Sequence, residues 1–194
     1  MKNLYFKKRL FIATLATAMF SLSLQASSNN EIKMEAKAAI MKLGKTLKSE
    51  VVKNMKANGP VSTAYFCYKN AKKLTKKVNA TYKKGISVKR ISLKNRDKNN
   101  YPSSKDEIAM LKKLSAQAKT GKKLPKLIVE KISDNHYKVY KPIFVGKKCI
   151  VCHGDARHRS KEAYKIIKEK YPNDKAIGYK VGDFRGAFVA NIIK

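Results

Sequence analysis

Two of the three cysteines in this 194-residue chain lie in the stretch KKCIVCHGD, at residues 147–155. Cys149 and Cys152 have the spacing C-x-x-C, and His153 follows the second cysteine directly. Three kinds of chemistry use such residues: a disulfide, a zinc site and covalent attachment of haem. A zinc site needs four ligands, whereas the chain offers the two cysteines and a loose choice among three histidines.

The position of His153 distinguishes these alternatives. Neither a disulfide nor zinc explains why a histidine stands immediately after Cys152, whereas covalent haem does. Two thiols at this spacing can reach both vinyl groups of one porphyrin, and the next residue then lies beneath the iron. The motif therefore predicts one haem c attached to Cys149 and Cys152, with His153 as the proximal iron ligand.

The amino terminus predicts export. Four cations precede an apolar run from Leu10 to Leu24, and Ala26 supplies the small residue that signal peptidase prefers. We expect a signal peptide at residues 1–26, cleaved after Ala26, because the run is short and rich in Ser and Thr for a membrane anchor. Residues 27–194 are then one domain in the periplasm, where haem of this kind is attached.

The chain is strongly basic. Cleavage after Ala26 removes four cations and no acid, which lowers the formal net charge from +32 to +28. Only six of the 45 cations are arginines, so the charge is a lysine coat rather than a surface for reading nucleic acid. A solvated lysine-rich face explains it most simply. The sharper interpretation is attraction of an acidic redox partner or an anionic membrane surface.

Two long helices are predicted first. Apolar residues at steps of three and four predict a helix over 31–57 that ends near Gly59, and Pro60 suits the first turn of a second helix to Val78. Ser104 and Glu107 predict a capping box before a helix at 105–119. A further helix is expected over 160–171.

Strand patterns alternate with these helices. They predict a strand at 86–93, a hairpin of 126–133 with 136–145, and one or two strands in the tail GDFRGAFVANIIK. The motif CxxCH thus lies late in the chain, between a hairpin and a terminal strand. The expected class is α+β: an antiparallel sheet with helices packed on it.

Four segments resemble successive blocks of a known family: NGPVSTAYFCYKNAKKL, RISLKNRDKNNYPSSKDE, YKPIFVGKKCIVCHG and YPNDKAIGYKVGDFRGAFV. The chain is similar to exported haem proteins with a single CxxCH, once known only as a domain of unknown function. Members occur alone or as the sensor part of signalling proteins, and the resemblance implies a PAS-like fold. The family commonly has Ala-Pro after its lone cysteine, where this chain has Asn70-Ala71-Lys72.

The resemblance implies that Cys67 is the distal iron ligand. From the residues alone the assignment stays open, because Cys67 lies on the apolar face of its predicted helix, where a cysteine usually just packs. Other side chains could take the sixth position: His136, His158, Met55 and Met110.

Arginine is scarce here, so three of the six stand out. Arg90, Arg96 and Arg185 are candidates for bidentate pairing with the haem propionates, although ordinary surface arginines would explain each one singly. Tyr140 and Phe144 precede the motif and are expected either to line the haem pocket or to pack in the core.

Electron transfer is the function that the sequence favours. A six-coordinate haem changes little on reduction, and thiolate ligation lowers its potential. The alternative is a redox or gas sensor for NO or CO that signals through a partner. A peroxidase-like enzyme would need a distal acid–base group, and no His/Arg pair is placed for that, so we expect no enzyme.

Overall fold

The computed structural model describes the backbone of residues 3–194 and the side chains of residues 29–194. The signal peptide predicted at residues 1–26 lies outside the residues with described side chains and stays a prediction. Within the part of the chain that is described, no helix is long and apolar enough to cross a membrane.

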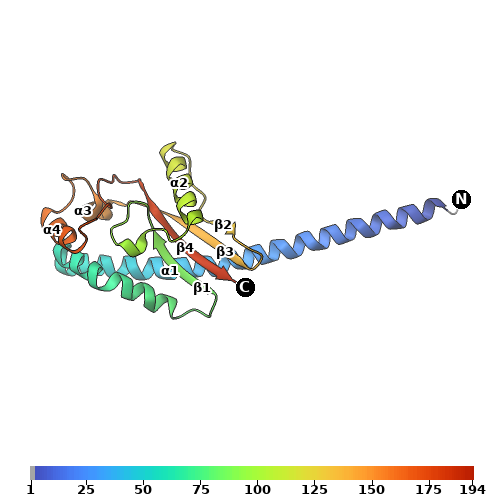
Figure 1. Ribbon diagram of the computed structural model, residues 1–194, viewed down its shortest axis with the longest axis horizontal. Coiled ribbons are helices and arrows are strands. Elements are labelled where there is room, and N and C mark those ends of the chain that lie inside the picture. Colours follow the sequence, from blue (N-terminus) through green and yellow to red (C-terminus); the bar gives the residue numbers. More distant parts are fainter. Residues whose placement is uncertain (1–2) are drawn as a thin grey trace.

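The first helical element, α1 (Asn3–Asn79), consists of two helices joined at a sharp kink. Gly59 has φ 71° and ψ −174°, a backbone conformation that glycine adopts without steric cost. Pro60 follows and begins the second helix, where its missing N–H leaves no hydrogen bond unmade. The chain reverses here, so that the second helix of α1 returns along the sheet (Figure 1). The two predicted helices and the break between them are confirmed.

Four antiparallel strands form a single sheet in the order β1-β4-β3-β2. They are β1 (Ile86–Ile91), β2 (Ile128–Lys131), β3 (His136–Phe144) and β4 (Phe184–Ile193). The predicted hairpin is the β2–β3 pair, and the tail supplies one strand, which pairs with both β1 and β3. The predicted α+β class with a PAS-like antiparallel sheet is confirmed.

The two faces of the sheet carry separate apolar cores, because successive strand residues point to opposite sides. Val139 and Ala190 pack with Ile40 and Leu43 of α1. Their neighbours in sequence pack instead against α2 (Lys105–Lys119), on the other face of the sheet. That second core contains Met110, Leu111, Leu114, Tyr140 and Val189. The sheet thus lies between α1 and α2 (Figure 1).

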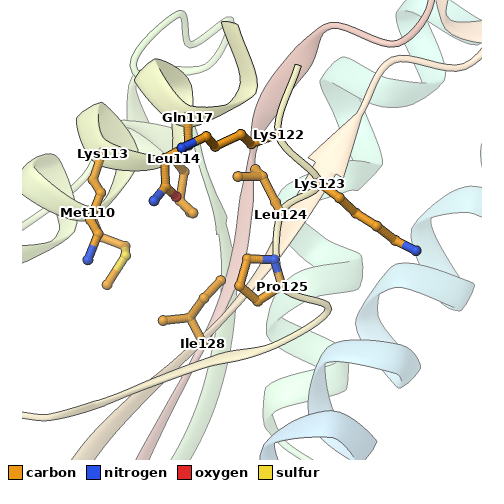
Figure 2. Close-up of a pocket in the computed structure, with 9 residues that line it drawn as sticks. All are labelled: Met110, Lys113, Leu114, Gln117, Lys122, Lys123, Leu124, Pro125 and Ile128. Carbon is orange, nitrogen blue, oxygen red and sulfur yellow. The ribbon is translucent and has the colours of Figure 1, made fainter. Parts of the chain in front are cut away.

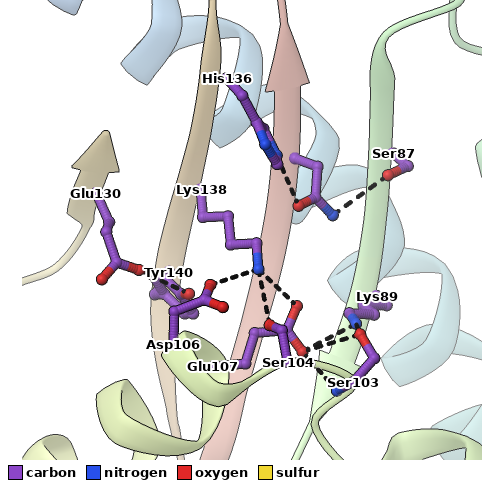
Figure 3. A network of polar contacts seen from close by, with 11 residues as sticks. Ser87, Lys89, Ser103, Ser104, Asp106, Glu107, Glu130, His136, Lys138 and Tyr140 are labelled. Carbon is purple, nitrogen blue, oxygen red and sulfur yellow. Dashed lines mark hydrogen bonds and ion pairs between the residues drawn. The ribbon is translucent and has the colours of Figure 1, made fainter. Parts of the chain in front are cut away.

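The start of α2 differs from the predicted capping box. The helix begins at Lys105 as predicted, but the Ser104 side chain makes no cap hydrogen bond. Its hydroxyl accepts from Lys138 Nζ at 2.9 Å, and Glu107 Oε2 accepts from the backbone N–H of Ser103 at 2.9 Å (Figure 3). The predicted box is wrong in this detail because Lys138 of β3 and Lys89 of β1 attract the two side chains.

A cavity of about 310 Å³ lies between α2 and the segment leading into β2 (Figure 2). Its wall is largely apolar, with lysines and Gln117 beside it. Of the residues singled out in the sequence, only Met110 lines it. Met110 therefore belongs to the packing beneath α2.

Candidate cofactor site

A single helical turn carries the CxxCH motif. The short 3₁₀ helix η2 (Lys147–Cys149) runs into α3 (Ile150–His153), so that Cys149, Cys152 and His153 lie on one face. Neither cysteine forms a disulfide within the described part of the chain, and Cys149 is exposed whereas Cys152 is half-buried. A side chain at position 154 would meet Ile150 atoms at 2.7 Å, so glycine is the residue that lets the turn close directly after His153.

His153 is held by a backbone carbonyl. Its Nδ1 lies 2.7 Å from the carbonyl oxygen of Ala176, and because a carbonyl only accepts, Nδ1 must carry the proton. Nε2 then keeps its lone pair. Burial lowers the pKa of His153 well below its usual value, and the charges of Arg96 and Arg185 lower it further. The imidazole is therefore neutral near pH 7, as a metal-binding histidine must be.

The loop that supplies this carbonyl is itself held in place by the buried carboxylate of Asp174. Asp174 Oδ1 accepts from the N–H of Ala176 at 2.8 Å, and Oδ2 accepts from Arg96 Nε and Nη2, each at 3.2 Å. Arg96 Nη2 also donates to the carbonyl oxygen of Cys152 at 2.7 Å. Arg96 thus bridges the CxxCH turn and the loop behind His153.

The structure brings Cys67 near the motif. Cys67 lies on α1 after the kink, and its thiol is half-buried. Burial raises the pKa of Cys67, while the positive charges of Arg90 and Arg96 act in the opposite direction. A negative charge on Cys67 would in turn raise the pKa of Cys152, which burial already raises. Cys67, Cys152 and these two arginines therefore share one electrostatic environment.

Arg90 differs from the other two arginines in its contacts. Among the residues with described side chains, none forms a hydrogen bond or ion pair with it, and burial lowers its pKa. Arg185 donates to Ser92 and to the carbonyl oxygen of Lys94. Burial above all, together with the charges of Arg90 and Arg96, lowers the pKa of Arg185 to about 10. Such uncompensated positive charge fits a group with two carboxylates, as haem has.

Two of the four alternative sixth ligands, His136 and Met110, lie away from the CxxCH turn. His136 is at the opposite end of β3 from Phe144, with Nε2 3.4 Å from Asn191 Oδ1. The ring of His158 is exposed and lies 2.8 Å from the Asp155 carboxylate. Met55 is half-buried on α1, and Met110 packs beneath α2.

Two aromatic residues before the motif have separate positions. Tyr140 is fully buried in the α2-side core and donates to Glu130 Oε2 at 3.0 Å. Of the two roles expected for Tyr140, this position matches packing in the core. Phe144 is 47% exposed and packs edge-on against Phe184.

The sequence interpretation missed three features of the site. Asp174 and Tyr179, whose ring lies edge-on to His153 at 6.4 Å, are in the last block of the family resemblance, but no spacing rule singled them out. The carbonyl of Ala176 has no signature in residue type. Within the described residues, no three His, Cys, Asp or Glu side chains cluster to hold a metal ion by themselves.

Comparison with known proteins supports the fold and defines the family. The crystal structure of the cyanobacterial heme-protein Tll0287 is similar, with a TM-score of 0.62 and 23% sequence identity over 85% of this chain and 96% of that chain. A search of curated proteins finds no match. Residues 24–192 match the sequence model of the Tll0287-like family. The chain belongs to the Tll0287-like family.

Proposed function

We propose that this protein is a periplasmic haem protein of electron transfer, with one haem c bound through Cys149 and Cys152. One observation carries the proposal. The Ala176 carbonyl holds the Nδ1 proton of His153, which leaves Nε2 free on the same turn as both cysteines. Metal-binding histidines typically donate their second ring nitrogen in this way. The similar structure, Tll0287, is itself described as a heme-protein.

The surrounding residues supply the other contacts that a haem needs. Arg90 and Arg185 would pair with the propionates, because no described side chain pairs with Arg90 and both guanidiniums are desolvated by burial. Cys67 would be the distal ligand, presented by α1. When bound, the haem would supply a one-electron Fe(III)/Fe(II) couple. We further propose an acidic redox partner or an anionic membrane surface as the docking target of the lysine coat.

Sensing is the second candidate function, and one observation favours it. Burial raises the pKa of Cys67, so the thiol protonates more readily than an exposed cysteine. A ligand that is easily protonated would leave the iron on reduction and open a position for CO or NO. The carrier is preferred because Cys67 would be presented by the second helix of α1, whose Val78 and Leu74 pack in the core against the sheet.

Covalent attachment is tested first. Protein produced in a host that matures c-type cytochromes should retain haem in the polypeptide after acid–acetone extraction, because two thioether bonds hold it. Replacing both Cys149 and Cys152 by Ala should release all of it, and the matched variant Cys67→Ala should release none. Haem that moves into the solvent from the unaltered protein would contradict the proposal.

The change Cys67→Ser tests the distal ligand, and CO binding then separates carrier from sensor. An anionic sulfur donor stabilises Fe(III), so its replacement should raise the reduction potential and convert a low-spin ferric spectrum into a high-spin one. CO added to the reduced, unaltered protein should bind poorly if Cys67 stays bound and readily if it leaves. An unchanged ferric spectrum in Cys67→Ser would remove Cys67 from the iron.

A further inference from the structure

We infer that Arg96, together with Asp174, is a positioning pair that sets how strongly His153 donates to the iron and thereby the reduction potential. The inference rests on the proposed function, since it assigns a tuning role to residues behind the proximal ligand. The sequence predicts that Arg96 pairs with a haem propionate. The role inferred here comes instead from the hydrogen bonds that Arg96 donates to other residues of the protein.

The carbonyl oxygen of Ala176 accepts hydrogen bonds from two side chains. It accepts from His153 Nδ1 at 2.7 Å and, at a longer 3.4 Å, from Arg96 Nη2. A carbonyl that accepts only the histidine would draw the Nδ1 proton strongly and make the imidazole a better electron donor. The second donor carries a full positive charge, so it competes for the same oxygen. Arg96 therefore limits how much this hydrogen bond strengthens His153.

The carboxylate of Asp174 keeps this arrangement in place. Its side chain is fully buried, and its two oxygens act on different partners: one on the Ala176 N–H and the other on the Arg96 guanidinium. The backbone of Ala176 is thus held at its N–H by Asp174, while the carbonyl of the same residue faces His153. Arg96 is also attached to the CxxCH turn through the carbonyl of Cys152. The orientation of His153 and the position of Arg96 cannot change independently.

The two members of the pair should shift the potential in opposite directions. The Arg96 charge disfavours the ferric state, which carries one more positive charge, and its competition for the Ala176 carbonyl weakens His153 as a donor. Both effects raise the potential. The Asp174 carboxylate offsets the Arg96 charge and therefore lowers it. A purely structural role would give no such opposition of sign.

The experiment compares Arg96→Gln and Asp174→Asn by anaerobic redox titration with optical spectra. Arg96→Gln should shift the Fe(III)/Fe(II) equilibrium toward Fe(III) by about tenfold, which is about 59 mV to lower potential. Asp174→Asn, which keeps an oxygen for the Ala176 N–H, should shift it toward Fe(II). Arg157→Gln is the matched control, because it removes the same charge from an exposed side chain near the motif and should change little. Shifts of the same sign in both variants, or as large in Arg157→Gln, would overturn the inference.

Arg96→Lys shows whether the shift in Arg96→Gln comes from misfolding. A measurement on haem-free protein tests the inference separately from the proposed function. Arg96→Lys keeps the charge but loses the fork of donors, so its potential should lie between those of the unaltered protein and Arg96→Gln. In haem-free protein, ¹⁵N spectra should show the Nδ1–H tautomer of His153, with a smaller Nδ1–H population in Asp174→Ala, which removes the oxygen that holds the Ala176 N–H. If the unaltered protein binds no haem, the proposed function fails while the tautomer still reports on the pair. A tautomer that is insensitive to Asp174 would contradict the positioning role.

Discussion

Two clusters of charged side chains flank the sheet, and they differ in how completely their charges are balanced. The paired cluster, on the α2 face, consists of Lys89, Lys138, Asp106 and Glu107 (Figure 3). The arginine cluster consists of Arg90, Arg96 and Arg185, with Asp174 as its ion-paired carboxylate. Lys89 and Arg90 are consecutive residues of β1, so strand alternation directs them to opposite faces.

Charge balance is complete in the first cluster. Glu107 is 1% exposed and is contacted by Lys89 Nζ at 3.0 Å and by Lys138 Nζ at 3.6 Å, while Lys138 also pairs with Asp106. In the arginine cluster only Arg96 has an ionic partner among the described residues. Burying an ion costs several kcal/mol unless it is paired. The paired cluster, whose charges balance, therefore stabilises the fold. The arginine cluster has surplus positive charge and is suited to bind an anionic group.

The largest change in stability is expected when the paired cluster is broken. Glu107→Gln removes the carboxylate that two lysines share, leaving Lys138 buried with only the partly exposed Asp106. Unfolding free energy, measured by denaturant titration, should fall by about 3–5 kcal/mol. Glu169→Gln, which removes an exposed carboxylate paired with Lys170, should change it by less than about 1 kcal/mol. A loss for Glu107→Gln as small as that of the control would mean that the cluster is not a stabilising unit.

In the arginine cluster, replacing Arg90 should change the free energy of unfolding less and in the opposite direction. Arg90→Met replaces a half-buried, unpaired cation by an apolar side chain of similar length. In haem-free protein, the free energy of unfolding should stay the same or rise by about 1 kcal/mol, because a desolvated charge has been removed. The same change at Arg96 should destabilise the protein, since it leaves Asp174 buried without its cation. If Arg90→Met destabilises haem-free protein like Arg96→Met, the surplus charge is not a cost of folding.

Several elements were predictable because their signals are local. The break at Gly59-Pro60 follows from backbone conformation, and alternating residues along β3 and β4 follow from the strand repeat. The bounds of α2 were correct, yet its predicted capping box was not, because the partners of Ser104 and Glu107 come from Lys138 and Lys89 on other strands. Local patterns cannot report a competing charge that only folding brings near.

The sequence by itself determined the chemistry available to this protein: two thiols and an imidazole at the spacing of one helical turn. It also singled out Arg90 and Cys67, one by its rarity and the other by family resemblance. Only the tertiary structure decided that the Ala176 carbonyl faces His153, and that Arg96 is committed to Asp174 while Arg90 is not. The physical reason is that spacing along the chain constrains neighbours within a turn or two. Contacts such as Arg96 with Asp174, 78 residues apart, depend on how the sheet and its loops pack.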